Sequence, residues 1–263
     1  NVIAVKPAQN QTKQNVVIGA HYDNVYGYEL RNPYTNLNYS TLSHGAYDNG
    51  SGVAVMMNIA HSIKDKNLPF NVIFIAFGAE ESGMCGSAHY VSNLSAVQKE
   101  NLLLMVNLDS IAAGDYLYMF CLDYSSVHED YIRKQAGSLN IPLKALPLNK
   151  KFIADPFGSQ AYSHYGYFSD NYAFIQENIP TAIFMSMNWE SKKKAGVVES
   201  DSNADIMHTQ NDNYQQLKEL YPETYLLYMK NVSDIVIKTL EQQDFVAAMT
   251  QSRKDTPSYD FIT

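Results

Sequence analysis

Short apolar runs that stop abruptly at polar residues are the feature of this chain that most constrains its fold. The clearest runs cover residues 15–20, 71–79 and 102–110, and similar runs occupy 116–122 and 181–187. Each run is short and apolar with little alternation, which is typical of a strand buried on both faces of a sheet. The sequence therefore predicts a sheet built largely from buried strands.

Helix-like segments alternate with these runs. Apolar residues after Gly52 recur at helical spacing as far as about residue 63. Further helices are expected over residues 83–99, 127–139, 169–178 and 213–241, and a polar tail over 243–263. Alternating strands and helices predict an α/β fold, a mixed but mainly parallel central sheet flanked by helices. The length of 263 residues suits one large α/β domain or two small ones, and we expect a single domain over 1–263.

Charge and composition exclude several classes of protein. The net charge is -8 and only three arginines occur, so we expect no nucleic-acid partner. No apolar run approaches the roughly 18–20 residues of a membrane span. Two cysteines cannot form a disulfide framework. A charged fraction of 17% with 20 tyrosines favours a secreted or cell-surface protein, whose upstream segment and export signal we expect to precede residue 1.

Polar residues follow three of the predicted strands directly. His21 ends the first, the pair Glu80–Glu81 the second and Asp109 the third, while Asp48 precedes the first predicted helix. Any one of these is most simply a solvated charge at a strand end. Together they indicate a ligand site, because ligands bind at the carboxyl ends of strands in open α/β sheets. Histidine and carboxylates without cysteine are the donor set of a catalytic zinc site.

Six motifs in this order resemble those of the co-catalytic (two-zinc) aminopeptidase family of metallopeptidases, which also contains glutaminyl cyclases and some carboxypeptidases. They are AHYD (20–23), YDNGSGVAV (47–55), FGAEESGMCGSAHYV (77–91), NLDSIA (107–112), SDNYAFIQENIPTAIF (169–184) and HTQNDN (208–213). The resemblance covers residues 1 to about 240. It implies a three-layer zinc-exopeptidase fold of the phosphorylase/hydrolase-like type.

The same resemblance assigns the metal ligands and two zinc ions. The implied ligands are His21, Asp48, Glu81, Asp109 and His208. His21 and Asp109 match ligands of one zinc, Glu81 and His208 match ligands of the other, and Asp48 matches the bridge between them. An anionic bridge of Asp48 and a hydroxide offsets the repulsion of two dications about 3.5–4 Å apart. The family often has a cis peptide bond after this aspartate.

Two further acidic residues match catalytic positions of the family. Glu80 matches the general base, which takes a proton from the attacking water and returns it to the leaving amine. Asp23 matches the aspartate that accepts the second ring N–H of the histidine ligand and so fixes its tautomer. The tyrosine that often precedes the last histidine is replaced here by Met207, so an oxyanion-stabilising group must come from elsewhere.

Candidate substrate-binding residues lie in the aromatic segment 162–174. Tyr165 and Tyr167 are candidates for the pocket, although a tyrosine is more often packing or pocket wall. Asp170 matches an acidic position that faces the substrate in the glutaminyl cyclases, and it is equally well placed to cap the predicted helix at 169–178.

The resemblance implies a zinc-dependent exopeptidase, an aminopeptidase that acts on peptides with a free N-terminus. Two alternatives stay open at this point. One is a glutaminyl cyclase or dipeptide carboxypeptidase on the same fold, and the other is a non-catalytic, receptor-like binding domain that has lost the metals.

Overall fold

A six-stranded sheet forms the centre of the computed structural model, which describes residues 1–25, 43–121, 126–145, 169–191 and 199–255. The strand order is β1-β3-β2-β4-β6-β5. The strands are β1 (Val2–Lys6), β2 (Asn15–His21), β3 (Asn71–Phe77), β4 (Leu102–Leu108), β5 (Tyr116–Phe120) and β6 (Thr181–Met187). Strands β3, β2, β4 and β6 run parallel, whereas β1 and β5 pair antiparallel at the two edges. The prediction of a mixed, mainly parallel sheet is confirmed.

Burial along the strands explains why they appear in the sequence as continuous apolar runs. Every residue of β4 and β6 is buried, because both faces of these central strands are covered. The edge strand β1 is different, with four of its five residues exposed.

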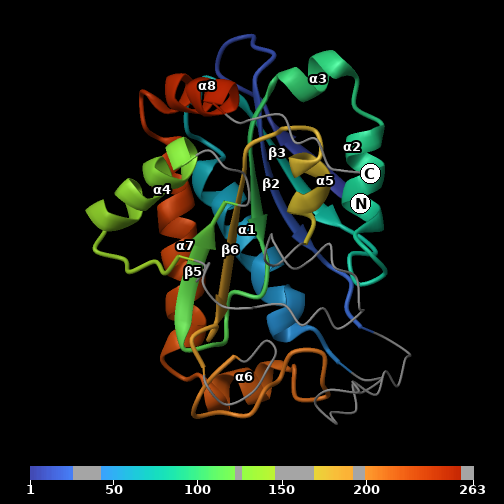
Figure 1. Ribbon diagram of the computed structural model, residues 1–263, viewed down its shortest axis with the longest axis vertical. Coiled ribbons are helices and arrows are strands. Elements are labelled where there is room, and N and C mark those ends of the chain that lie inside the picture. Colours follow the sequence, from blue (N-terminus) through green and yellow to red (C-terminus); the bar gives the residue numbers. More distant parts are fainter. Residues whose placement is uncertain (26–42, 122–125, 146–168, 192–198, 256–263) are drawn as a thin grey trace.

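Helices cover the two faces of the sheet and complete three layers (Figure 1). One face carries α1 (Ser51–Ile63), α4 (Ser126–Ser138), α7 (Thr224–Leu240) and α8 (Phe245–Asp255), which pack on the larger apolar core. The other face carries α2 (Cys85–Ser92), α3 (Ala96–Glu100) and α5 (Asn171–Ile175) over a smaller core. In the part of the chain that is described, no helix has both the length and the apolarity that crossing a membrane requires.

Two of the predicted helices are each divided in the structure. The stretch 83–99 forms α2 and α3, because Ser95 begins a new helix as its N-cap in a capping box with Gln98. The stretch 213–241 forms α6 (Tyr214–Leu220) and α7, and Pro222 lies in the gap between them. Proline disfavours helical backbone in the residue before it, which accounts for this break.

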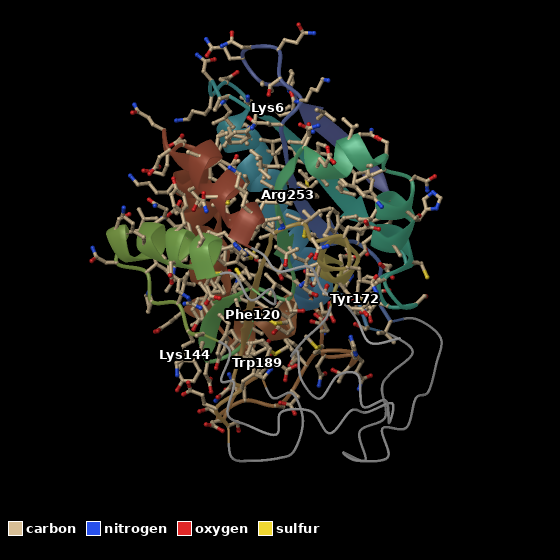
Figure 2. All side chains as sticks on the ribbon, turned by 45° about the horizontal axis from the view of Figure 1, so that its top comes forward. Lys6, Phe120, Lys144, Tyr172, Trp189 and Arg253 are labelled. Carbon is tan, nitrogen blue, oxygen red and sulfur yellow. The ribbon has the colours of Figure 1, made fainter. Side chains whose placement is uncertain are left out.

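The expected polar tail is wrong for residues 245–255, which form α8. Phe245 and Met249 are fully buried in the core beside α4, and Arg253 Nη1 donates to the carbonyl of Leu102 at 2.6 Å. The apolar residues of this helix are confined to its first half, 245–249, and polar residues follow as far as Asp255, so the composition of 243–263 as a whole is polar. Figure 2 labels Arg253 and, lower in the view, Trp189 beside Phe120, whose ring centroids are 5.4 Å apart.

Candidate metal centre

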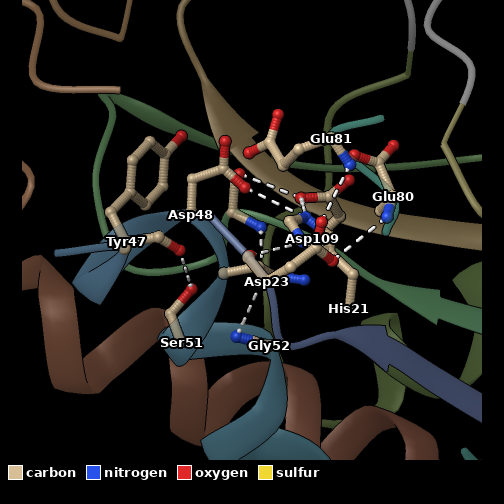
Figure 3. Close-up of polar contacts among 12 residues, drawn as sticks. His21, Asp23, Tyr47, Asp48, Ser51, Gly52, Glu80, Glu81 and Asp109 are labelled. Carbon is tan, nitrogen blue, oxygen red and sulfur yellow. Dashed lines mark hydrogen bonds and ion pairs between the residues drawn. The ribbon is translucent and has the colours of Figure 1, made fainter. Parts of the chain in front are cut away.

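His21 lies at the carboxyl end of β2 and is 2% exposed. Its Nδ1 atom is 3.1 Å from the backbone carbonyl oxygen of Asp23. A carbonyl oxygen can only accept, so Nδ1 carries the proton and the lone pair of Nε2 is free to bind a metal. That Nε2 atom lies 3.1 Å from Oδ1 of Asp48 and 3.5 Å from Oδ1 of Asp109 (Figure 3).

Asp23 fixes this tautomer through its backbone, which differs from the expected carboxylate contact. Its carboxylate is 3.7 Å from Nδ1 of His21 and instead accepts hydrogen bonds from the backbone N–H groups of Glu80 and Glu81, at 3.1 and 3.2 Å. Asp23 thus connects the end of β2 to the loop after β3. The sequence identified the residue as part of the site but could not show which of its atoms acts on which neighbour.

Asp48 lies in a tight turn, Ala46–Gly50, at the start of α1, and its peptide bond to Asn49 is cis, as the resemblance implies. The side chain of Asn49 holds this turn against β4. Its amide nitrogen donates to the carbonyl of Leu108 at 2.9 Å, and its oxygen accepts from the N–H groups of Gly52 and Ser110. The turn is therefore fixed to the strand that supplies the next ligand, Asp109.

A second clamp on this turn is Asp212, which the sequence did not single out. Its fully buried carboxylate accepts from the backbone N–H of Tyr47 at 2.6 Å and from that of Asp48 at 3.1 Å. Asp212 is four residues beyond His208, within the motif at 208–213. The sequence signal that could have identified Asp212 is a carboxylate four residues after a predicted ligand histidine. Asp212 thus joins the segment that carries His208 to the turn that carries Asp48.

Two groups of ligand atoms share Asp48. The first contains His21, Asp48 and Asp109, and the second contains Asp48, Glu81 and His208. In the second, Nε2 of His208 lies 2.9 Å from Oδ2 of Asp48 and 3.3 Å from Oε1 of Glu81. One carboxylate oxygen of Asp48 thus faces each histidine. The structure brings together all five of the predicted metal ligands.

The charges at the site perturb one another strongly. Burial alone would lower the pKa of His21, but hydrogen bonds and charges from Asp109 and Asp48 raise this pKa well above its ordinary value. The pKa of His208 is raised in the same way by Asp48 and Glu81. Burial and the charge of Asp109 raise the pKa of Glu80 to about 9. These groups compete for protons because several carboxylates share one buried volume.

This arrangement fits zinc. Ligand atoms about 2.0–2.1 Å from a tetrahedral ion lie about 3.3 Å from one another, which matches the nitrogen–oxygen distances in both groups. Asp109 Oδ2 is buried and receives no hydrogen bond, so it has a free lone pair where a cation would bind. Histidine nitrogens and carboxylate oxygens without cysteine are also the donors of catalytic zinc sites.

Asp170 begins α5 but does not cap it. Its side chain makes no capping hydrogen bond, it is fully buried, and within the described residues the polar group beside its carboxylate is the hydroxyl of Ser87, which donates to the carbonyl of Met84 at 3.0 Å. Burial raises the pKa of Asp170 to about 7, and the charge of Asp170 in turn raises the pKa of Glu80. Asp170 is therefore an acidic neighbour of the candidate base. The candidate pocket residues Tyr165 and Tyr167 lie outside the described residues.

Comparison with known proteins decides the family. Residues 1–232 match the family model described as peptidase family M28. The chain belongs to peptidase family M28.

The relatives and structures most similar to this M28 chain include bacterial aminopeptidases. It is 35% identical over 131 residues to aminopeptidase YwaD of Bacillus subtilis, which is 48% of this chain and 26% of that protein. It is 32% identical over 110 residues to the alkaline phosphatase isozyme conversion protein of Escherichia coli, 42% of this chain and 32% of that one. The structure of BSAP, a zinc aminopeptidase from Bacillus subtilis, matches with a TM-score of 0.67 and 25% identity over 92% of this chain and 50% of that chain. This M28 chain therefore spans half or less of these proteins.

Proposed function

We propose that this M28 chain is the catalytic part of an aminopeptidase that binds two zinc ions and removes residues from the free N-terminus of peptides. The observation that carries the proposal is the position of the Asp48 carboxylate between His21 and His208. Its two oxygens lie 3.1 Å from Nε2 of His21 and 2.9 Å from Nε2 of His208, as a carboxylate shared by two metal ions requires. Zinc bound there would polarise the scissile carbonyl and lower the pKa of the attacking water.

Glu80 supplies the proton transfer in this proposal. Its backbone is held by Asp23, and its carboxyl group is buried beside Asp109 and Glu81. Burial and these neighbouring carboxylates raise the pKa of Glu80 in the metal-free chain, and the positive charge of bound zinc would lower it again, towards the neutral range in which a carboxylate takes a proton from water and returns it to the leaving nitrogen. Glu81, the next residue, faces His208 instead and serves as a ligand.

Recognition of the substrate amine is assigned to the acidic groups beside Glu80. The buried carboxylate of Asp170 accepts at most one hydrogen bond among the described residues, from Ser87, which leaves an oxygen to pair with the ammonium of a bound peptide. An Asp170→Asn variant should therefore raise KM for peptides with a free N-terminus more than it lowers kcat.

Hydrolysis of aminoacyl-nitroanilides, with and without zinc, tests the activity, and N-acetylated versions of the same substrates are the control. Zinc-dependent cleavage of the free substrates alone is expected. Efficient cleavage of N-blocked peptides at internal bonds would rule out an aminopeptidase.

The metal content of the purified protein tests the alternatives. About two zinc ions per chain support the peptidase, one favours a glutaminyl cyclase, and none favours a binding domain.

Export from the cell is part of the same proposal and rests on composition alone.

A further inference from the structure

The segment that carries His208 lies outside every helix and strand of the described chain. His21 and Asp109 stand at strand ends and inherit their positions from the sheet. His208 instead follows an irregular stretch and has a left-handed backbone, with φ of 58°. Its position therefore depends on the contacts of the residues just before and after it. Asp212 supplies the contact that follows His208.

Glu199 supplies the contact that precedes it. The side chain is 2% exposed, and its Oε1 atom accepts hydrogen bonds from the backbone N–H of Met207 at 2.8 Å and from that of Ile206 at 3.3 Å. Its charge also raises the pKa of Tyr47 and Tyr221, which are buried in the same apolar cluster as Ile206. A buried carboxyl group is thus aimed at the two residues that lead directly into the ligand.

Glu199 is itself anchored to the sheet through Asp115, the residue before β5. The N–H of Asp115 donates to the carbonyl of Glu199 at 3.0 Å. The carboxylate of Asp115 accepts from the hydroxyl of Ser200 at 2.6 Å and from the N–H of Asp201 at 2.8 Å. A continuous set of hydrogen bonds therefore runs from the edge of the sheet to the backbone beside His208.

The surroundings of the second oxygen of Glu199, Oε2, favour the protonated form of the carboxyl group. Oε2 is buried and accepts no hydrogen bond from a donor in the described residues, and the side chain of Glu199 lies within hydrogen-bonding reach of the carboxyl group of Asp205. Burial and Asp205 together raise the pKa of Glu199 to about 8. A proton on Oε2 turns that atom into a donor towards Asp205 and leaves Oε1 to accept from both backbone amides. A glutamine side chain offers the same pattern, one acceptor and one donor.

We propose that Glu199 is a positioning residue for the second metal site, the one formed by Asp48, Glu81 and His208, and that its hold on the backbone at 206–207 sets the zinc affinity of that site. The inference rests on the proposed two-zinc function. It does not assign Glu199 any contact with metal or substrate.

Zinc titration of the metal-depleted full chain tests this proposal, with a competing chelator dye reporting each binding step. Wild type should bind two zinc ions, and His208→Ala should keep only the first with high affinity. Glu199→Ala should bind the first zinc as wild type does and the second at least about tenfold more weakly, as for other residues that orient a ligand. Glu199→Gln should restore both affinities, because its amide reproduces the acceptor and donor.

Two further variants separate positioning from general destabilisation. His128→Ala is the matched control, because His128 is fully buried between Ser252 and the carbonyl of Thr181, in contact with other parts of the fold. It should lower the melting temperature and leave both zinc affinities unchanged. Glu199→Asp, whose side chain is shorter by one methylene, should lower the affinity for the second zinc ion. This variant replaces Glu199→Ala in the test if Glu199→Ala does not fold.

Several results would overturn the proposal. Wild-type affinity for both zinc ions in Glu199→Ala or Glu199→Asp would overturn it, as would equal weakening of both sites or failure of Glu199→Gln to restore the second. A wild-type chain that binds two zinc ions without cleaving peptides would refute the proposed peptidase activity but leave this inference standing.

Discussion

At the scale of single residues, two adjacent glutamates have different surroundings. Glu81 lies within 3.3 Å of the ligand His208, whereas Glu80 is surrounded by the carboxylates of Asp109, Glu81 and Asp170. Both backbone N–H groups are held by Asp23, so the loop presents the two side chains from a fixed position. The different neighbours predict different consequences of mutation.

Glu80→Gln should separate catalysis from metal binding. The amide has the same size as the carboxyl group but cannot accept the proton, so kcat should fall by about 10²–10⁴ while bound zinc stays near the wild-type amount. Nitroanilide kinetics beside metal analysis measure both quantities. The matched variant Glu81→Gln should lose zinc from the second site. If Glu80→Gln lost its metal or kept full activity, the roles of the two residues would be assigned wrongly.

Asp48→Asn should be more damaging to zinc binding than any other single ligand change. Asp48 faces both histidines, whereas Asp109→Asn or His208→Ala alters only one of the two groups. An amide lacks the charge that offsets two dications, so Asp48→Asn should bind fewer zinc ions than either comparison variant and show no peptidase activity. Calorimetric zinc titration, with circular dichroism to verify folding, measures this. Two zinc ions bound at near-native affinity would place the bridge elsewhere.

At the scale of elements, the buried strands could be predicted from the sequence, whereas the bounds of the last helices could not. Runs such as those in β4 and β6 are apolar on both faces, so their pattern reflects burial directly. The break of the last long helix follows from the local effect of Pro222, whereas the docking of α8 by Phe245 depends on contacts with residues distant in the sequence. The ligand residues were predictable because they end strands or match family motifs, whereas Glu199 lies in an irregular segment that shows no pattern.

The contact between α1 and β4 predicts a sharp effect at Gly52. A Cβ atom there would lie 2.3 Å from the carbonyl oxygen of Leu108 and 2.4 Å from Oδ1 of Asn49, both fixed groups. Gly52→Ala should therefore cost about 1–3 kcal/mol of folding free energy and weaken zinc binding through the displaced turn at Asp48.

Gly137→Ala is the matched control for Gly52→Ala. Gly137 lies within α4 and an added Cβ would meet nothing within 4 Å. The same substitution there should stabilise the protein by about 0.5–1 kcal/mol and leave zinc binding unchanged. Denaturant unfolding measures both variants, and a Gly52→Ala protein as stable as wild type would contradict the close approach of α1 to β4.

At the scale of the whole molecule, the ligands tie together segments that are far apart in the sequence. They come from the end of β2, the turn before α1, the loop after β3, the end of β4 and the segment before α6, between residues 21 and 208. A metal bound to these residues would therefore stabilise the folded arrangement of five segments at once. Without metal, the same fold must bury carboxyl groups that favour their protonated forms.

The last prediction is that the metal-free protein loses stability as the pH rises from about 5 to 9. Burial raises the folded-state pKa of Asp170 and Asp212 to about 7, that of Glu199 to about 8 and that of Glu80 to about 9. The unfolded chain releases these protons near its ordinary carboxyl pKa of about 4, so the folded state binds more protons in this window and stability must fall with pH.

The histidine ligands act in the same direction, because their raised pKa contributes stability below the unfolded value of about 6.5 that is lost as the pH rises through the folded value. Asp48 is the exception, since burial would raise its pKa but hydrogen bonds from His208 and His21 lower it. Its contribution is lost only as the pH falls below about 4 and therefore lies outside the window.

Zinc competes with protons for the ligands, so its stabilising effect should be small at pH 5 and large at pH 8. Thermal unfolding in chelator and in zinc across this range measures both trends, and Asp170→Asn should flatten the metal-free curve between about pH 4 and 7. A metal-free melting temperature that rises between pH 5 and 8 would show that these carboxyl groups are not buried as the structure has them.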